Sequence, residues 1–303
     1  MSEHVVVGAG SIGTNVALRL AGRGETVRIV TRSGSGPEHP LIERVAADAS
    51  DPARLTELAR GAAVIYHCAN PPTYPTWERL LPPLQTAMIA AARATDAVLA
   101  LTGSLYAYGP QPGGRMDEHT PPAATDHKGR LRKRLWDQAR TSGVRTVEVR
   151  GSHFIGNNAA SFHSLIIAPA LKKGGTAWVP ADLDAPHSFT FNGDMARALI
   201  TLAGDDRAWG RPWHVPSPPA VSVRELVRRY DTAAGRPPTR LIPVPRFVMR
   251  LAGLVVPIAR ETAQIDYQWY APYVMDATET AATFGLTATD LDTAVSDEVG
   301  VKV

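Results

Sequence analysis

The sequence predicts an α/β fold in which helices cover both faces of a parallel sheet. Short apolar runs alternate with amphipathic segments through the first 150 residues, and a glycine-rich turn joins the first run to the first amphipathic segment. Strands that alternate with helices form parallel sheets, because each crossover helix returns the chain to the same end of the sheet. A chain of 303 residues can bury such a sheet and a smaller companion lobe.

The first strand–turn–helix unit is the most specific of these observations. Residues 5–7 form an apolar run, the sequence Gly-Ala-Gly-Ser-Ile-Gly occupies residues 8–13, and a helix with one apolar face follows to residue 21. Residues 27–30 are then a second strand. Strand, glycine turn, helix and strand, in this order, form the context that a dinucleotide-binding fingerprint requires.

The alternation of strands and helices continues to residue 150, where the amino-acid composition changes. Beyond it Gly, Pro, Asn and His become frequent, and Pro-rich connections separate the helices. We therefore predict a nucleotide-binding domain at 1–150 and, at 151–303, mostly a substrate-binding lobe from which some elements return to the sheet. Pro82 and Pro83 are expected to break one helix near its start. Further strands are predicted at 44–46, 63–67, 98–102, 144–149 and 213–215, and helices at 52–59, 77–94, 130–141, 159–173, 193–203 and 223–234.

Composition excludes several classes of protein and site. Cys68 is the only cysteine, which excludes an internal disulfide and a cysteine-cluster metal site, and no His, Asp and Glu spacing resembles a metal site. The formal net charge of +3 is weak evidence for nucleic acid and is compatible with an anionic cofactor. The start of the chain lacks the pattern of a signal peptide, and the apolar stretch 247–259 is too short to span a bilayer. We expect a buried or packing helix at 247–259 and a cytoplasmic protein with no membrane partner.

The glycine turn has the chemistry of a dinucleotide site. Gly8 permits the tight turn, Gly10 lets the backbone approach a pyrophosphate, and Gly13 lets helix and strand pack closely. The free N–H groups at the helix start, at Ser11 and Ile12, then face the phosphates. A glycine turn without a ligand is the alternative interpretation.

The end of the second strand indicates which dinucleotide binds. An NAD site usually places Asp or Glu there for the ribose hydroxyls, whereas this strand ends in Thr31 and Arg32 with no acid. Arg32 can offer a planar, permanently charged fork to a 2′-phosphate. The sequence therefore predicts NADP(H), with a solvated surface arginine as the alternative for Arg32.

Taken together, the motifs resemble the atypical and extended short-chain dehydrogenases/reductases, the NAD-dependent epimerase/dehydratase superfamily, whose fold is Rossmann-like. The segments 104–109, 187–196 and 210–226 carry the resemblance beyond the nucleotide motifs, to about residue 230. The resemblance also implies a homodimer formed through helices of the nucleotide domain. It implies adenine-side contacts at Asp48 and Ala49, ribose-side contacts at Ala69 and Asn70, and an active-site role for Ser104.

One departure from the family pattern concerns catalysis. The Tyr-x-x-x-Lys pair is missing: Lys128 stands where the tyrosine is expected, and Arg132 stands where the lysine is expected. In the family, the tyrosine exchanges a proton with the substrate oxygen while hydride moves to or from the nicotinamide. Arg132 can hold ribose hydroxyls as a fixed cation, and Lys128 or Tyr106 is a candidate proton donor.

Each catalytic candidate also has a structural interpretation. Lys128 and Arg132 can form a solvated basic helix face, and Tyr106 can be pocket wall. His153 and His187 rank low as pocket residues, because a lone histidine is more often structural than catalytic.

Three functions are compatible with these observations. The main hypothesis is an NADP(H)-dependent oxidoreductase that acts on a small carbonyl, imine or hydroxyl metabolite. The first alternative is an epimerase or dehydratase with a transient redox step, and the second is an NADP(H)-sensing protein without catalysis. A nucleic-acid partner is not expected, because the basic run 128–134 is short and lacks interleaved aromatic residues.

Overall fold

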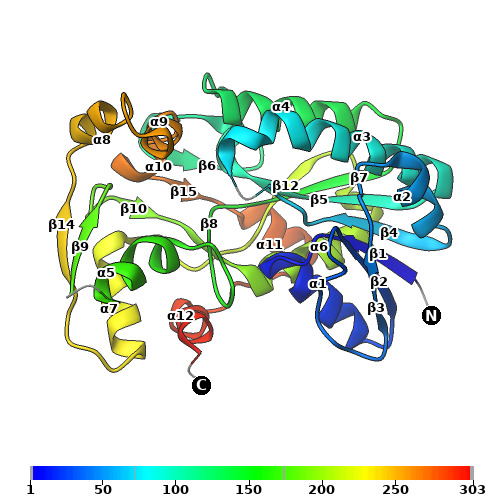
Figure 1. The fold of residues 1–303 in the computed structure, drawn as a ribbon, viewed down its shortest axis with the longest axis horizontal. Helices are drawn as coiled ribbons and strands as arrows, with labels where there is room; N and C mark the ends of the chain where they lie inside the picture. The colour runs from blue at the N-terminus through cyan, green and yellow to red at the C-terminus, as the bar shows by residue number, and fades with distance from the viewer. Residues whose placement is uncertain (1–2, 72, 173–174, 301–303) are drawn as a thin grey trace. The chain divides into compact units, whose positions relative to one another are not determined.

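The computed structural model describes residues 3–71, 73–172 and 175–300, drawn as a coloured ribbon in Figure 1. The chain divides into two compact units. The first unit contains the chain up to Ser104 together with Arg130–Arg150 and Gly193–Val215, and the second contains Leu105–Gly129, Gly151–Asn192 and the chain from Pro216 onward. The functional division that we expect at residue 150 stays a prediction.

In the described part of the chain, the first unit is built on a seven-stranded sheet with the strand order β12-β7-β5-β4-β1-β2-β3. Strand β1 pairs in parallel with β2 on one side and with β4 on the other. The chain therefore winds outward twice from the centre, and the winding reverses between β1 and β4. The predicted doubly wound parallel sheet is confirmed. The strands are β1 (Glu3–Val7), β2 (Thr26–Thr31), β3 (Ile42–Ala46), β4 (Ala62–His67), β5 (Val98–Ser104), β7 (Thr146–Gly151) and β12 (Pro212–His214).

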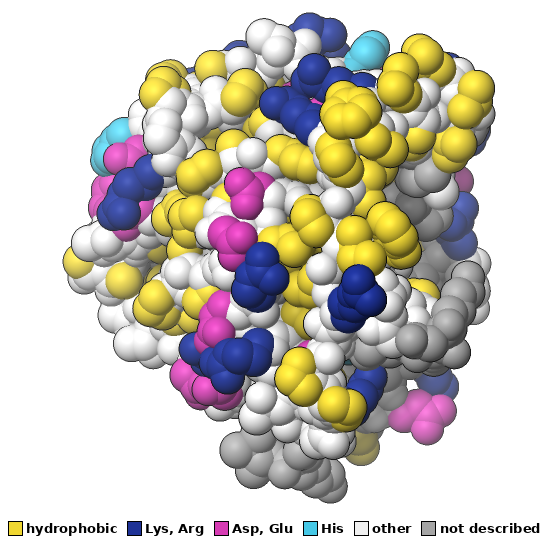
Figure 2. All heavy atoms as spheres, turned by 90° about the vertical axis from the view of Figure 1, so that its left-hand side faces the viewer, with side chains coloured by type: hydrophobic (Ala, Val, Ile, Leu, Met, Phe, Trp, Pro, Cys, Tyr) yellow, Lys and Arg dark blue, Asp and Glu magenta, His cyan; other side chains and the backbone are white. Residues whose placement is uncertain are grey.

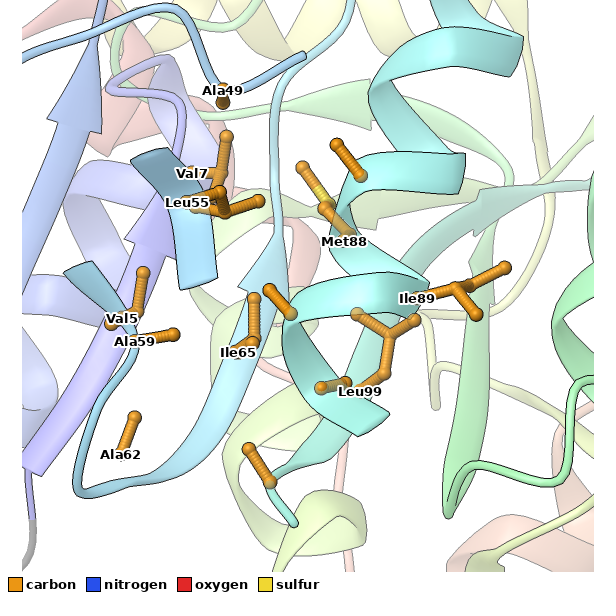
Figure 3. Close-up of a cluster of buried hydrophobic side chains, with 14 of the residues drawn as sticks. Val5, Val7, Ala49, Leu55, Ala59, Ala62, Ile65, Met88, Ile89 and Leu99 are labelled. Carbon is orange, nitrogen blue, oxygen red and sulfur yellow. The ribbon is translucent and has the colours of Figure 1, made fainter. Parts of the chain in front are cut away.

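Helices bury both faces of this sheet. Val5 and Val7 face one apolar cluster, in which Leu55 and Met88 cover the sheet (Figure 3). Val6, between them, is equally buried on the opposite face. Burial on both faces explains why the central strands are continuous apolar runs rather than alternating ones. The helices of this unit are α1 (Ser11–Ala21), α2 (Pro52–Leu58), α3 (Trp77–Thr95), α4 (His127–Arg140, whose first turn belongs to the second unit) and α6 (Asn192–Ala203).

Two helix predictions are wrong in detail. Helix α3 runs through Pro82 and Pro83 without a break. Trp77 and Leu81 on this helix are buried, so tertiary packing outweighs the two backbone hydrogen bonds that the prolines cannot make. The helix predicted at 159–173 begins later, as a π-helical turn η4 (His163–Ile167) followed by α5 (Ala168–Lys172).

The second unit consists of helices and pairs of short strands. Strand β8 (His153–Ile155) pairs with β11 (Phe189–Phe191), β9 (Thr176–Val179) with β14 (Arg240–Pro243), β10 (Pro186–His187) with β13 (Val221–Ser222), and β6 (Arg115–Met116) with β15 (Val274–Met275). The short helical turn η2 (Leu105–Tyr108) opens this unit. Its remaining helices include α7 (Val223–Ala233), α8 (Arg246–Ala252), α9 (Pro257–Ala263), α10 (Tyr267–Tyr270), α11 (Thr278–Phe284) and α12 (Leu291–Val299).

The stretch 247–259 contradicts the prediction of a single buried or packing helix. It divides into α8 and the start of α9, and α8 buries none of its residues. Gly253 ends the first helix and Pro257 begins the second. The apolar residues that suggested burial lie mostly on the surface.

Candidate functional site

The glycine turn lies at the carboxyl end of β1, where the winding of the sheet reverses. The Gly8 N–H donates to the carbonyl of Val30 at 3.0 Å, and Gly8 has a φ of +101°. A Cβ at Gly8 would lie 2.7 Å from the Cα of Ala69, and one at Gly13 would lie 2.0 Å from the Gly8 carbonyl oxygen. The fold itself therefore requires glycine at positions 8 and 13.

Gly10 differs from these two glycines. Its φ of −73° suits any residue, and a Cβ there would meet no atom of the described residues within 4 Å. It is the N-cap of α1, and no side chain caps that helix start. The first N–H groups of the helix, at Ser11 and Ile12, therefore meet neither a side-chain cap nor an acid of the first turn. Such a helix start is suited to an anion.

The predicted adenosine-side residues lie side by side at the ends of β2 and β3. Thr31 pairs with Ala46 in the sheet, and the Ala47 N–H donates to the Thr31 carbonyl at 2.9 Å. Hydrogen bonds from the Ser50 N–H and hydroxyl lower the pKa of Asp48, and the nearby charge of Arg32 adds to this effect. Arg32 is exposed. Ala49, next along the chain, is buried beneath this edge.

A second group of predicted residues gathers after β4. Ala69 packs against Gly8, and the Asn70 side-chain oxygen accepts a hydrogen bond of 2.7 Å from the Arg132 guanidinium. That guanidinium also lies 4.5 Å from the centre of the Trp77 ring. Burial, with the charge of Arg132 as a second cause, lowers the pKa of His67 to about 3. The structure therefore brings Arg132 together with Ala69 and Asn70 at one edge of the sheet.

Ser104 ends β5 at the same edge. Its hydroxyl oxygen is buried and has no hydrogen-bond partner among the described residues. Two positions earlier, the Thr102 hydroxyl lies 3.7 Å from the Cys68 sulfur, and burial raises the pKa of that thiol to about 12. The thiol is therefore protonated at neutral pH.

Lys128 and Tyr106 belong to the second unit rather than to the sheet. The Lys128 ammonium lies 2.7 Å from the Glu261 carboxylate and donates to the Glu261 carbonyl at 3.0 Å and to Gln264 at 3.3 Å. Only 4% of the side chain is exposed, so Lys128 is not part of a solvated basic face. These contacts tie the start of α4 to α9. Tyr106 lies in η2, close to Gly129.

An aromatic cluster in the second unit contains His153 and His187, which the sequence suggested only as low-ranked pocket residues. The His153 ring stacks on Trp269 with centroids 3.9 Å apart, and it lies 5.6 Å from His187 and 5.2 Å from Tyr273. The Nε2 atom of His153 and the hydroxyl of Tyr273 are buried without a hydrogen-bond partner among the described residues. We name these four residues the His–Tyr cluster. The sequence did not indicate that these residues, which come from three separate segments, lie together.

The His–Tyr cluster is uncharged at neutral pH. Burial lowers the pKa of His187 to about 4 and that of His153 well below its ordinary value. Burial also raises the pKa of Tyr273, and of Tyr267 beside it, where the charge of Asp126 is a second cause. Neutral imidazoles and phenols offer hydrogen-bond donors and acceptors to hydroxyl groups, and they carry no cation for a phosphate. Within the described chain, His, Cys, Asp and Glu form no metal-binding group.

The second unit also has an open pocket of about 380 Å³. Its two guanidiniums are paired: Arg224 lies 2.9 Å from Asp184, and Arg246 donates to Asp266. No residue that the sequence predicted as a site lines this pocket.

The sheet order, with a glycine turn at its point of reversal, defines a Rossmann-type nucleotide-binding protein. The family model described as the NAD dependent epimerase/dehydratase family matches residues 4–214. The chain belongs to the NAD-dependent epimerase/dehydratase family, as the sequence resemblance implies.

Solved structures share the fold across nearly the whole chain. The enzyme WbmH of Bordetella bronchiseptica in complex with NAD⁺ is 19% identical with a TM-score of 0.79, over 99% of this chain and 97% of its own. MoeE5 in complex with UDP-glucuronic acid and NAD is 19% identical with a TM-score of 0.80, over 99% and 98%. UDP-glucose 4-epimerase from Brucella ovis in complex with NAD is 18% identical with a TM-score of 0.76, over 99% and 98%. No curated protein matches the chain.

Proposed function

We propose that this protein is a cytoplasmic enzyme that binds NADP(H) and uses it in a transient redox step on a hydroxylated metabolite. This proposal follows the epimerase/dehydratase alternative rather than the net oxidoreductase that was our main hypothesis. Membership of the family supports the change, as do neighbours that include an epimerase and a complex with a nucleotide sugar. A nucleoside-diphosphate sugar is accordingly the first substrate class to test.

The observation that carries the proposal is the open space at Gly10. The fold needs glycine at positions 8 and 13, but no atom of the described residues needs it at position 10. A backbone that must approach a pyrophosphate closely does need it. The N–H groups of Ser11 and Ile12 then hold the phosphates, with Gly8, Gly10 and Gly13 shaping the turn.

The remaining cofactor contacts follow the edge of the sheet. Thr31 and Arg32 hold the 2′-phosphate, and the absence of an acid at the end of β2 supports NADP(H) over NAD(H). Asp48 and Ala49 face the adenine, and Ala69 and Asn70 face a ribose. The cofactor supplies the hydride acceptor and donor, which the side chains of this chain cannot provide.

For catalysis, each residue has a distinct part. Ser104 binds the reacting oxygen through its hydroxyl, which has no partner among the described residues, and Arg132 holds ribose hydroxyls from its place beside Asn70. Tyr106 is the preferred proton-transfer residue of the two candidates, because Lys128 is occupied by Glu261. The uncharged His–Tyr cluster suits the hydroxyl groups of the substrate, and a phosphate would need another part of the second unit.

The first test is a fluorescence titration with NADPH and NADH on the wild type, Arg32→Ala and a control, Arg60→Ala, which removes another exposed arginine. We expect NADPH to bind more tightly than NADH, and the preference to fall about tenfold in Arg32→Ala only. Binding of neither nucleotide would refute the proposal.

The second test separates the two redox modes. The protein is incubated with NADP⁺ and UDP-glucose or UDP-glucuronic acid, while absorbance at the NADPH band and the sugar configuration by NMR are followed. A changed sugar without net NADPH formation supports the transient redox step. Formation of one NADPH for each sugar converted would instead support the net oxidoreductase hypothesis.

A further inference from the structure

The surface of the second unit carries an apolar patch on α8 and the turn that follows it. Phe247 and Leu251, four residues apart on α8, are 64% and 61% exposed. Leu254 and Val255, in the turn, are 72% and 80% exposed. Scattered exposed leucines need no explanation, but large apolar side chains that adjoin one another on a surface mark an interaction site. We name Phe247, Val248, Leu251, Leu254, Val255 and Val256 the α8 patch.

Hydrogen bonds from α9 hold the turn that carries part of the α8 patch. The Arg260 guanidinium, on α9, donates to the carbonyls of Gly253 and Leu254 at 3.1 and 3.3 Å. These bonds satisfy carbonyls that the end of α8 leaves unpaired, and they hold the turn between the two helices. Leu254 and Val255 therefore project from a fixed helix–turn–helix hairpin rather than from an open loop.

Arginines adjoin the α8 patch along the chain. The segment 236–260 contains five arginines and no Asp, Glu or Lys. Asp266 pairs with Arg246 at 2.7 Å and with Arg250 at 3.3 Å, so one carboxylate offsets two of these charges and the segment stays cationic. Figure 2, which views the side with α8, shows hydrophobic side chains gathered in its upper part with arginine or lysine side chains beside them.

We propose that the α8 patch docks on the surface of an anionic lipid bilayer. An apolar helix face flanked by arginines places its side chains among acyl chains while the guanidiniums meet the lipid phosphates. A second copy of the chain is a poorer occupant, because a two-fold contact through this patch would bring two arginine-rich segments face to face. Among the described helices, none is long and apolar enough to cross a membrane. The attachment therefore runs along the surface and replaces our expectation of no membrane partner.

Vesicle flotation tests the proposal without cofactor or substrate, so its outcome is independent of the proposed function. The full chain is mixed with phosphatidylcholine vesicles, with and without phosphatidylglycerol, at low and at high salt. The variant Leu254→Asp/Val255→Asp introduces two carboxylates into the α8 patch. The control Leu165→Asp makes the same kind of change at an equally exposed leucine (63%) of the second unit, outside the patch. Thermal melting checks that each variant is folded.

We expect the wild type and Leu165→Asp to float with the anionic vesicles, more weakly at high salt, and hardly with the neutral ones. The double variant should lose at least tenfold in partitioning. No flotation with anionic vesicles, or equal flotation of the double variant, would overturn the proposal. Light scattering that finds a wild-type dimer and a monomeric double variant would overturn it in favour of a second copy.

Discussion

Replacing two glycines of the turn, one at a time, separates what the fold needs from what the cofactor needs. In Gly13→Ala, the new Cβ would lie 2.0 Å from the Gly8 carbonyl oxygen, whereas real Cβ atoms essentially never come within 3.0 Å of another atom. Helix and turn must therefore move apart by about 1 Å. Overpacking of this kind costs about 2 kcal/mol, which lowers the melting temperature by about 4 °C in a chain of this size. NADPH affinity should fall with it.

In Gly10→Ala, by contrast, the Cβ meets no atom of the described residues within 4 Å and the backbone has an ordinary φ of −73°. The melting temperature of the free protein should therefore stay within about 1 °C of the wild type. NADPH affinity should nevertheless fall at least tenfold, because the methyl group occupies the space through which the pyrophosphate approaches. Calorimetry of the free proteins and NADPH titration measure the two effects separately. A Gly10→Ala protein that binds NADPH as tightly as the wild type would refute the assignment of this turn.

Three further predictions concern other parts of the chain. Arg132→Met removes the hydrogen bond to Asn70, and it should weaken NADPH binding about tenfold in a titration while leaving the melting temperature nearly unchanged. Burial lowers the pKa of His187 to about 4, so below pH 6.5 the unfolded chain binds a proton that the folded chain does not. The free energy of unfolding should therefore fall by about 2 kcal/mol at pH 5 because of His187. In urea unfolding, His187→Gln should lose less stability than the wild type between pH 7.5 and 5. Glu261→Gln should destabilise more than Lys128→Met, because it leaves the buried ammonium without its carboxylate; equal unfolding midpoints would contradict the buried pair.

The sequence predicts the first unit well because its signals are local. Strand β4 is observed at Ala62–His67 and is predicted at 63–67 from one apolar run. Helix α1 follows its glycine turn as the fingerprint requires. The short strands of the second unit were missed for the opposite reason. Thr176–Val179 pairs with Arg240–Pro243, and a pairing between segments so far apart leaves no periodic pattern in either of them.

In the candidate site, too, local signals were predictable from the sequence and long-range contacts were not. The turn at residues 8–13 is recognisable because its three glycines within six residues match the spacing of the dinucleotide-binding turn. Lys128, in contrast, was considered either as a proton donor or as part of a solvated helix face, since its partner Glu261 lies more than a hundred residues along the chain. A buried ammonium and a solvated one have the same local sequence, so only the packing of α9 distinguishes them.

The substituted catalytic pair leads to a consequence for the second unit. Arg132 cannot give up its proton and Lys128 is paired with Glu261, so we propose that neither residue transfers the proton. On this proposal the proton comes from other groups, and the candidates Tyr106 and the His–Tyr cluster belong to the same unit of the chain. Burial keeps the imidazoles of that cluster neutral and its phenol protonated. We therefore propose that the acid of the reaction is found among these residues of the second unit, while the first unit keeps the cofactor motifs of the family.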